Sequence, residues 1–491
     1  MKTWKCDVCG YVHHDAGPPA SCPVCGVDGD SFSILAITTG QHPPVAAGVW
    51  QCGICSYRHQ AVHPPATCPV CSATSAMFAP LITPETNVEQ AGNLRRIVVL
   101  GGGIAGLTAA AEARRHSPHA SITLVSREPS LPYYRLNLTR FLAGDVSEEE
   151  LLIQSRNWFD EQEIDFCPAE AASIDRQKHC VMLRDGRSLD YDFLVLTNGA
   201  HPFIPPFPGA TREGVHVLRT IDDARAILKH IAAGMRIVCI GGGLLGLETA
   251  GALARHKAQI TVIEGFPSLL PRQLPPRAGE LLQKRLETQG MDILCTRTVM
   301  ELVGDECVQG VVLENGQLLP ADLVIITVGV RPNSYLARQA GLTVHRGIVV
   351  DDRMFTSDPH ILAAGDVTEH RGALYGIWPA GYAQGAVAGC NAGGGAAEFS
   401  GMAPSTRIKV LDIDLFSCGQ IHSEDASTTL HEQLDGDSYR AFFCRDGQLV
   451  GAVLYGDTST AGLLKDIVEN GRQISECPEL AGLIHPSAIP V

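Results

Sequence analysis

The stretch RRIVVLGGGIAGLTAAAEARRHSPHASITLVSRE, residues 95–128, determines the architecture of most of this chain. An apolar run ends in Gly101, Gly103 and Gly106, an alanine-rich helical segment follows, and a second apolar run leads to Glu128. Glycines in this spacing let a backbone approach a pyrophosphate, whose charge the following helix N-terminus favours. An acidic residue about 25 positions on can accept a hydrogen bond from a ribose hydroxyl. The stretch predicts a dinucleotide-binding strand-helix-strand unit; a glycine-rich turn used only for packing is the alternative.

The same unit recurs at residues 235–266, MRIVCIGGGLLGLETAGALARHKAQITVIEGF. Its glycines are Gly241, Gly243 and Gly246, and they again follow an apolar run that predicts a strand. Two such units in one chain predict two bound dinucleotides.

Glu264 ends the second strand of this later unit. A carboxylate there would bind a free ribose 2′-hydroxyl and repel a 2′-phosphate, and the next residues, Gly265 and Phe266, supply no arginine. The second unit therefore favours NADH over NADPH.

A cysteine module stands twice at the N-terminus. The sequence WKCDVCGYVHHDAGPPASCPVCGVDGDSF at 4–32 returns, shifted by 46 residues, as WQCGICSYRHQAVHPPATCPVCSATSAMF at 50–78. Two CxxC pairs facing each other form a tetrahedral sulfur site, which suits zinc or a single redox iron. A module of about 35 residues cannot hold itself together by its own core, so the ion must also be structural. The predicted ligands are Cys6, Cys9, Cys22 and Cys25 in the first copy and Cys52, Cys55, Cys68 and Cys71 in the second.

Composition sets the broad class of the protein. With 491 residues the chain is expected to form several domains. A net charge of −15 argues against nucleic acid or an anionic membrane as the main partner. The apolar runs are too short to span a bilayer, and the sequence before Trp4 leaves no room for a signal peptide. We therefore expect a soluble cytoplasmic protein, in which paired CxxC motifs are metal ligands rather than disulfides.

The cysteine modules resemble the short rubredoxin-like module found at the end of rubrerythrins. The aromatic residue before the first cysteine, the Gly-Tyr after the second and the CPxC pair carry the resemblance. It implies an iron ion that is held by four cysteines and shuttles one electron. One departure is that Gly10 and Gly26 of the first copy become Ser56 and Ser72 in the second. If these turns need positive φ, serine costs roughly 1 kcal/mol, so the second site is expected to be strained or shifted in potential.

Residues 95 to about 395 resemble the two-dinucleotide flavoprotein family of pyridine-nucleotide reductases. Besides the two glycine units, the segments FLVLTNGAHP (193–202), LVIITVGVRPN (323–333) and PHILAAGDVTEHRGALYGIWPAGYAQG (359–385) carry this resemblance. Within the family, EGFPSLLPRQLP and YGIWPAGYAQG point to NADH:rubredoxin reductases and to the flavin part of the nitrite reductase large subunit.

The family resemblance implies FAD in the first unit and NADH in the second. The FAD set is Gly101, Gly103, Ile104, Ala105, Gly106, Glu128, Arg135, Arg140, Gly199 and Asp366, and the NADH set is Gly241, Gly243, Gly246, Glu248, Glu264 and Gly329. In this set Arg135 and Arg140 would lie near the isoalloxazine, with Arg140 replacing the usual lysine; a solvated basic pair is the alternative. Glu248 falls where the family faces the nicotinamide. Asn198 departs from the ATG triplet of the family.

The absence of cysteine near the first glycine unit also bears on the reaction. Disulfide reductases of this architecture carry a cysteine pair beside the flavin, and peroxide or coenzyme A disulfide relatives carry one cysteine there. No cysteine occurs from Gly101 to Phe166. The flavin is thus expected to pass its electrons to something other than a protein thiol, and no side chain is assigned as catalytic.

The predicted fold class is α/β, with Rossmann-like FAD and NAD domains, a small α+β C-terminal domain and two rubredoxin-like metal modules. Segments rich in proline, glycine and threonine separate the modules and read as tethers. The predicted boundaries are 1–36 and 47–82 for the modules, 95–215 with 320–395 for the FAD domain, 216–319 for the NAD domain and 403–491 for a C-terminal interface domain. In this last domain TRIKVLDIDLFSCG and YRAFFCRDGQLVGAVLYG predict strands joined at an Asp-Gly turn.

These features predict an NADH:rubredoxin oxidoreductase fused to its own two acceptors. Electrons would pass from NADH through FAD to two Fe(Cys)4 sites and on to an external protein such as a rubrerythrin or a flavodiiron protein; a homodimer is possible. The alternative is a flavin-dependent NADH reductase that acts directly on another acceptor, in an oxygen, nitric oxide or nitrite pathway, with the modules as zinc ribbons that bind a partner.

Overall fold

A computed structural model gives the fold of this protein. The structure describes residues 2–6, 12–15, 32–34, 49–52, 58–66, 68, 75, 78–80, 95–402, 405–410, 413–422, 427–480 and 484. The chain divides into two compact units, one formed by Met1–Gly48 with Gln60–His63 and the other by Val49–His59 with Pro64–Val491.

The two cysteine modules repeat each other in backbone structure. Each has a three-stranded antiparallel sheet in which the first strand lies in the centre, with orders β2-β1-β3 and β5-β4-β6. Cys6 pairs with Phe32 in the first sheet, and Cys52 pairs with Phe78 in the second, again 46 residues apart. The repeat seen in the sequence is therefore a repeat in strand register. The strands are β1 (Lys2–Cys6), β2 (Val12–Asp15), β3 (Phe32–Ile34), β4 (Val49–Cys52), β5 (Arg58–Gln60) and β6 (Phe78–Pro80).

The first large domain is built on a five-stranded parallel sheet of order β25-β13-β7-β8-β9. Its strands are short apolar runs that are largely buried, as expected where helices cover both faces of a parallel sheet. The strands are β7 (Arg96–Leu100), β8 (Ser121–Ser126), β9 (Ile164–Pro168), β13 (Phe193–Leu196) and β25 (Ile361–Ala363), and α1 (Ile104–His116) connects β7 to β8.

The second large domain repeats this plan with a parallel sheet of order β15-β22-β16-β17-β18. Its central strand also leads into a glycine loop and a helix. The elements are β15 (Val215–His216), β16 (Arg236–Ile240), α5 (Leu244–Ala254), β17 (Gln259–Glu264), β18 (Asp292–Cys295) and β22 (Leu323–Ile326). The predicted α/β class with two Rossmann-like units is confirmed.

Each domain also carries a three-stranded antiparallel sheet, so the internal repeat extends beyond the glycine unit. These sheets are β10 (Ala171–Asp175), β11 (Cys180–Leu183) and β12 (Ser188–Asp190) in the first domain and β19 (Val299–Val303), β20 (Gly310–Leu313) and β21 (Leu318–Pro320) in the second. A parallel pair, β24 (Ile348–Val350) and β26 (Thr368–His370), follows the return of the chain to the first domain.

Short helices connect these sheets. They are η3 (Arg135–Asn137), α2 (Leu138–Leu142), η4 (Glu149–Leu151), α3 (Arg156–Glu161), α4 (Ile221–His230), α6 (Pro276–Thr288) and α7 (Tyr335–Gln339). Two further strands, β14 (Ala200–Pro202) and β23 (Val330–Pro332), pair where the chain crosses between the domains.

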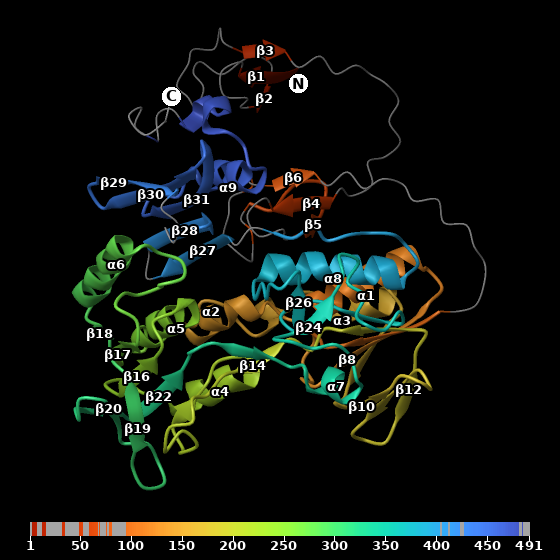
Figure 1. Cartoon of the computed structure of the whole chain (residues 1–491), viewed down its shortest axis with the longest axis horizontal. Helices are drawn as coiled ribbons and strands as arrows, with labels where there is room; N and C mark the ends of the chain where they lie inside the picture. The colour runs from red at the N-terminus through yellow and green to blue at the C-terminus, as the bar shows by residue number, and fades with distance from the viewer. Residues whose placement is uncertain are drawn as a thin grey trace. The chain divides into compact units, whose positions relative to one another are not determined.

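Helix α8 (Trp378–Ala392) packs along α1, as Figure 1 shows. Small residues allow the contact, because Gly385 and Gly389 of α8 lie directly over the backbone of Ala105 and Ala109 of α1. A β-carbon on Gly389 would lie 2.1 Å from the carbonyl oxygen of Ala109. The separation of the two helices therefore depends on glycine at this position.

The C-terminal domain is a five-stranded antiparallel sheet of order β27-β28-β31-β30-β29, with α9 (Ala461–Glu469) packed on β28 and β31. Asp446 and Gly447 both have positive φ and join β30 to β31, which confirms the Asp-Gly hairpin turn predicted from sequence. The strands are β27 (Ser405–Val410), β28 (Ile413–Gly419), β29 (Thr429–Asp435), β30 (Ser438–Arg445) and β31 (Gln448–Tyr455), and the 3-10 turns η5 (Ile474–Glu476) and η6 (Pro478–Leu480) follow α9.

Among the described residues, no helix combines the length and the apolar character needed to cross a membrane.

The contact between α1 and α8 can be tested with Gly389→Ala. The added methyl group would overlap the carbonyl of Ala109 and push the helices apart, so we expect a loss of about 1–3 kcal/mol in the free energy of unfolding. Thermal melting of the purified protein measures it. Gly265→Ala is the control, because a β-carbon there meets no atom within 4 Å. Equal melting temperatures for the two variants would contradict the close helix contact.

Candidate functional site

The first glycine loop is closed by contacts that leave no room for side chains. Gly101 has φ of 125°, and a β-carbon on it would lie 2.2 Å from the carbonyl oxygen of Thr197. A β-carbon on Gly106 would lie 1.9 Å from the carbonyl oxygen of Gly101. The loop therefore folds back against the start of α1, and glycine at both positions is a steric requirement.

The second loop has the same construction at Gly241 and Gly246. A β-carbon on Gly246 would lie 1.9 Å from the carbonyl oxygen of Gly241. A threonine hydroxyl is hydrogen-bonded to each loop. Thr197 Oγ1 donates to the carbonyl oxygens of Leu100 and Gly101, both at 3.0 Å. Thr327 Oγ1 donates to the carbonyl oxygens of Ile240 at 3.1 Å and Gly241 at 3.3 Å. The two threonines lie far from the glycines in sequence, so the glycine motif did not predict them.

Both loops fit a pyrophosphate. Gly103 and Gly243 are the N-cap residues of α1 and α5, and neither helix has a capping side chain or an acidic residue in its first turn. A β-carbon on Gly103 or Gly243 would meet no atom within 4 Å. Each helix thus presents free N–H groups and its positive dipole end to open space, which is the environment that binds an anion.

The strand that follows each loop ends in a different way. In the second domain Glu264 is the last residue of β17, and its carboxylate accepts from the N–H of Gly242 at 2.7 Å and of Phe266 at 2.9 Å. In the first domain the last residue of β8 is Ser126, whose side chain borders Gly102. Glu128 comes two residues later, so it is not the positional equivalent of Glu264.

Glu128 belongs instead to a group of hydrogen-bonded side chains next to the first loop. Its carboxylate accepts from Arg135 Nη2 at 2.7 Å and from the hydroxyl of Tyr133. Tyr133 Oη also accepts from the N–H of Ile221 at 3.1 Å, which connects this group to the start of α4. Burial raises the pKa of Tyr133, so the phenol stays protonated and donates. The structure therefore brings the predicted residues Glu128 and Arg135 together.

Asp366 is held by a residue that the sequence analysis did not single out. Arg219 Nη2 donates to Asp366 Oδ2 at 2.8 Å, and Arg135 also donates to the carbonyl oxygen of Arg219. Gly199 lies beside this pair, because a β-carbon on it would be 3.6 Å from Arg219 Nη2. Glu128, Arg135, Arg219 and Asp366 are each half-buried and form two ion pairs, which place charged donors and acceptors beside the first loop.

Gln384 of α8 fixes the turn that carries Asp366. Its Oε1 accepts from the N–H of Gly365 at 2.9 Å, and the residue is almost fully buried. Within the described chain its Nε2 has no hydrogen-bond partner. The amide thus orients the Gly-Asp turn through the N–H of Gly365.

Arg140, predicted near the isoalloxazine, and Glu248, predicted to face the nicotinamide, differ in their surroundings. Arg140 of α2 is exposed, whereas the neighbouring Thr139 is buried and its hydroxyl donates to Glu248 Oε2 at 3.4 Å. Within residues 95–402, all of which are described, no cation forms an ion pair with Glu248. Burial without a countercharge raises the pKa of the Glu248 carboxyl to about 7, against the smaller lowering effect of the Thr139 hydrogen bond.

Gly329 lies at the edge of the second domain, where the chain turns back toward the first. It has φ of 111°, a β-carbon on it would meet no atom within 4 Å, and its carbonyl oxygen accepts from the N–H of Phe203 at 2.9 Å. The position is open on its side-chain face, as a residue next to a bound cofactor should be.

The predicted metal ligands are described only in part. Cys52 and Cys68 are both buried, with 0% and 2% of their surface exposed, as expected for thiolates that enclose an ion. Of Cys6 the structure describes the backbone alone. The predicted ligands Cys9, Cys22, Cys25, Cys55 and Cys71 lie outside the described residues.

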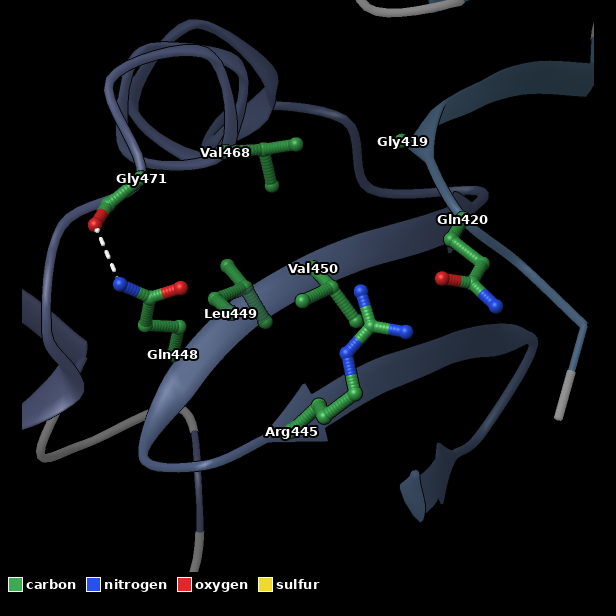
Figure 2. Close-up of a pocket in the computed structure, with 8 residues that line it drawn as sticks. All are labelled: Gly419, Gln420, Arg445, Gln448, Leu449, Val450, Val468 and Gly471. Atoms are coloured by element: carbon green, nitrogen blue, oxygen red, sulfur yellow. Dashed lines mark hydrogen bonds between the residues drawn. The ribbon is translucent and has the colours of Figure 1, made fainter. Parts of the chain in front are cut away.

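A shallow hollow in the C-terminal domain lies between β31 and the end of α9 (Figure 2). Leu449, Val450 and Val468 form its apolar floor, and Gln448 Nε2 donates to the carbonyl oxygen of Gly471 at 3.0 Å. Arg445 is the one ionisable side chain among the residues that line it. The lining residues include no carboxylate, histidine or thiol.

Three family comparisons cover nearly the whole chain. Residues 95–385 match the model described as pyridine nucleotide-disulphide oxidoreductase, and residues 404–472 match the rubredoxin NAD+ reductase C-terminal domain. Residues 4–33 and 50–79 each match the rubrerythrin, rubredoxin-like domain. The module boundaries found in this way agree with the repeat read from the cysteines.

Individual relatives share the large body. A nitrite reductase [NAD(P)H] of Bacillus subtilis is 35% identical over 392 residues, which are 79% of this chain and 49% of that protein. An NADH-rubredoxin oxidoreductase of Clostridium acetobutylicum is 30% identical over 393 residues, 79% of this chain and 98% of that protein. The chain spans about half the length of the nitrite reductase relatives it matches.

Solved structures agree with the observed fold. The crystal structure of NADH:rubredoxin oxidoreductase from Clostridium acetobutylicum superposes with a TM-score of 0.66 at 30% identity, over 78% of this chain and 96% of that one. The covalent putidaredoxin reductase-putidaredoxin complex superposes with a TM-score of 0.74 at 27% identity, over 80% of this chain and 97% of that one.

The ionisation of Glu248 predicts a pH-dependent stability. The folded carboxyl keeps its proton up to about pH 7, whereas the unfolded chain loses it near its ordinary pKa of 4.5. Folding therefore becomes less favourable as pH rises from 4.5 to 7. Glu248→Gln removes this effect, so its stability relative to the parent protein should increase by about 1–3 kcal/mol between pH 5 and pH 8.

Thermal melting at the two pH values measures this change. Glu149→Gln is the matched control, because Glu149 is exposed and its replacement should give the same difference at both pH values. A pH-independent difference for Glu248→Gln would show that the carboxyl is ionised throughout.

Proposed function

The chain belongs to the pyridine nucleotide-disulphide oxidoreductase family, and we propose that it is an NADH:rubredoxin oxidoreductase that carries its own two acceptor modules. In this proposal electrons pass from NADH through FAD to Fe(Cys)4 sites in the N-terminal modules and then to an external protein. The observation that carries the proposal is that one chain combines two open glycine loops with two four-cysteine modules.

The residues of the first domain are suited to hold FAD. The loop at Gly101–Gly106 and the N-terminus of α1 would bind the pyrophosphate, and Asp366, oriented by Arg219 and Gln384, would bind the ribitol part. We assign the contact with the adenosine ribose to Ser126, which ends β8, and to Glu128, two residues later. Bound FAD would supply a site that accepts a hydride and releases the two electrons singly.

The second domain is suited to NADH. The loop at Gly241–Gly246 would bind its pyrophosphate, and Glu264 would accept from the ribose hydroxyls. Glu248, half-buried on α5 and held by Thr139, would face the nicotinamide, where a carboxyl can bond the carboxamide. Arg135, which is ion-paired with Glu128 and donates to the carbonyl oxygen of Arg219, would face the negative charge of the FAD pyrophosphate and not the flavin ring, whereas exposed Arg140 is better placed to meet solvent or a partner.

The acceptor modules make a second protein unnecessary for the first transfer. A hydride brings two electrons, and two one-electron sites on the same chain can take both. Covalent attachment keeps each module at an effective concentration on the order of mM near the body. The absence of cysteine from Gly101 to Phe166 supports transfer to metal and not to a thiol. We propose a rubrerythrin or a flavodiiron protein as the final acceptor, and a homodimer as the assembly.

The metal content tests this function directly. Purified protein should contain two irons per chain, show a red colour and a high-spin ferric EPR signal, and bleach under anaerobic NADH, since each Fe(Cys)4 site takes one electron. Cys52→Ser with Cys55→Ser should remove one iron and half of the bleaching. The control Cys307→Ser changes an exposed cysteine outside the modules and should leave both unchanged. A colourless protein with one zinc per module would refute the proposal.

The choice of nicotinamide cofactor tests the role of Glu264. Its carboxylate is fixed by two backbone N–H groups, so a 2′-phosphate would meet a negative charge that cannot turn away. We expect kcat/KM for NADH to exceed that for NADPH by at least about tenfold, and Glu264→Gln to reduce this ratio. Steady-state kinetics with both cofactors measure it. Glu280→Gln removes an exposed carboxylate of the same domain and should leave the ratio unchanged.

A further inference from the structure

The second domain is inserted into the first, and the two connecting segments pair with each other. The chain leaves the first sheet after β13, enters the second domain through β14, and returns through β23 before it completes the first sheet with β25. Strands β14 and β23 form a two-stranded antiparallel ribbon between the two large sheets (Figure 1). Both covalent connections between the two domains therefore run through this ribbon, while α2 of the first domain also packs on α4 and α5 of the second.

The backbone pairing of β14 with β23 alone holds the two domains only weakly. Its register contains only the pairs Ala200 with Pro332, His201 with Arg331 and Pro202 with Val330. Pro202 and Pro332 lie at pairs that do not exchange backbone hydrogen bonds, because the N–H groups of Phe203 and Asn333 donate at the neighbouring positions. The ladder loses no hydrogen bond to the prolines, but a two-stranded ribbon of three residues per strand is marginally stable on its own. The ribbon can then hold a fixed angle only if other contacts support it.

Two asparagines supply such contacts at the end of the ribbon nearest the first domain. Asn198 Nδ2 donates to the carbonyl oxygen of Asn333 at 2.6 Å, and Asn333 Nδ2 donates to the carbonyl oxygen of Asn198 at 2.6 Å. The N–H of Asn333 also donates to the carbonyl oxygen of Gly199 at 2.9 Å, and His201 Nδ1 lies 2.7 Å from Asn333 Oδ1. We call this reciprocal pair, Asn198 and Asn333, the asparagine clasp.

The clasp is joined to the first cofactor loop. Asn198 follows Thr197, whose hydroxyl closes the loop, and its N–H lies 2.8 Å from the position of a β-carbon on Gly101. On the other side Gly199 borders the Arg219 guanidinium that holds Asp366. The clasp thus connects the residues around the proposed FAD site to the strand that returns from the second domain.

The internal repeat shows that the glycine loop itself does not need the clasp. Thr327, Val328 and Gly329 of the second domain correspond to Thr197, Asn198 and Gly199, and Val328 is 37% exposed. The clasp also leaves Asn198 Oδ1 buried without a hydrogen-bond partner in the described part of the chain, which makes folding less favourable. The second domain forms its glycine loop without a clasp, and the clasp leaves a buried oxygen unpaired. Stabilisation of the glycine loop therefore does not explain why the clasp is present.

We infer that Asn198 and Asn333 are positioning residues that fix the orientation of the second domain on the first, and so place the nicotinamide of NADH against the flavin. This inference rests on the proposed function for its kinetic consequence, because hydride transfer needs the two rings in contact. Loss of the clasp would let the ribbon bend. The orientation of the second domain that allows hydride transfer would then be one of several that the protein adopts.

The test uses the full-length holoenzyme with Asn198→Ala, Asn333→Ala and the double variant. Hydrogen–deuterium exchange should become faster in the amides of residues 199–203 and 329–333 in all three variants. Stopped-flow reduction of the flavin by NADH should slow by about tenfold, with the dissociation constant for NAD+ little changed, since the contacts to the dinucleotide remain. The double variant should be no slower than the single ones, because both amides belong to one clasp.

Val328→Ala is the matched control, since it truncates the equivalent side chain of the second domain and touches no part of the clasp. It should leave exchange in both segments and the reduction rate unchanged. If Asn198→Ala fails to fold, Asn333→Ala removes the clasp from the other strand and gives the same readouts.

Unchanged exchange in both ribbon segments, or losses of rate that add in the double variant, would overturn the inference. These outcomes are separate from failure of the proposed function. A protein that contains zinc in place of iron would still reveal, by exchange alone, whether the clasp holds the ribbon.

Discussion

The architecture depends on the close approach between the last glycine of each loop and the carbonyl oxygen of the first. A β-carbon on Gly106 or Gly246 would lie 1.9 Å from that oxygen, well inside any permitted contact. This approach turns the chain sharply from the central strand into the helix and leaves the helix N-terminus uncapped. The open helix N-terminus, which is suited to an anion, therefore follows from this turn.

Local patterns predicted the parts of the fold that depend on neighbouring residues. The two glycine units, the two cysteine modules and the Asp446–Gly447 hairpin were predicted because each depends on residues within one short segment. The predicted repeat of the cysteine modules is confirmed in the pairing of Cys6 with Phe32 and of Cys52 with Phe78. Such features need no knowledge of the distant chain.

Residues that act across the fold were missed for the opposite reason. Thr197, Arg219 and Gln384 meet the site only after strands far apart in sequence have paired, and no short pattern marks them. A related limit applies to Glu128, which the spacing placed at the end of a strand. Strand β8 ends two residues earlier, at Ser126, and the spacing from the glycines alone cannot distinguish the two positions.

The insertion of the second domain has a consequence for the way the chain is made. Strand β25 lies at the edge of the first sheet and pairs with β13, yet it is synthesised only after the entire second domain. The second domain is continuous in sequence and can complete its sheet while it leaves the ribosome, whereas the first must wait with one edge of β13 unpaired. The order of strands along the chain therefore lets the inserted domain complete its sheet first, and the ribbon of β14 and β23 joins it to the sheet that is completed last.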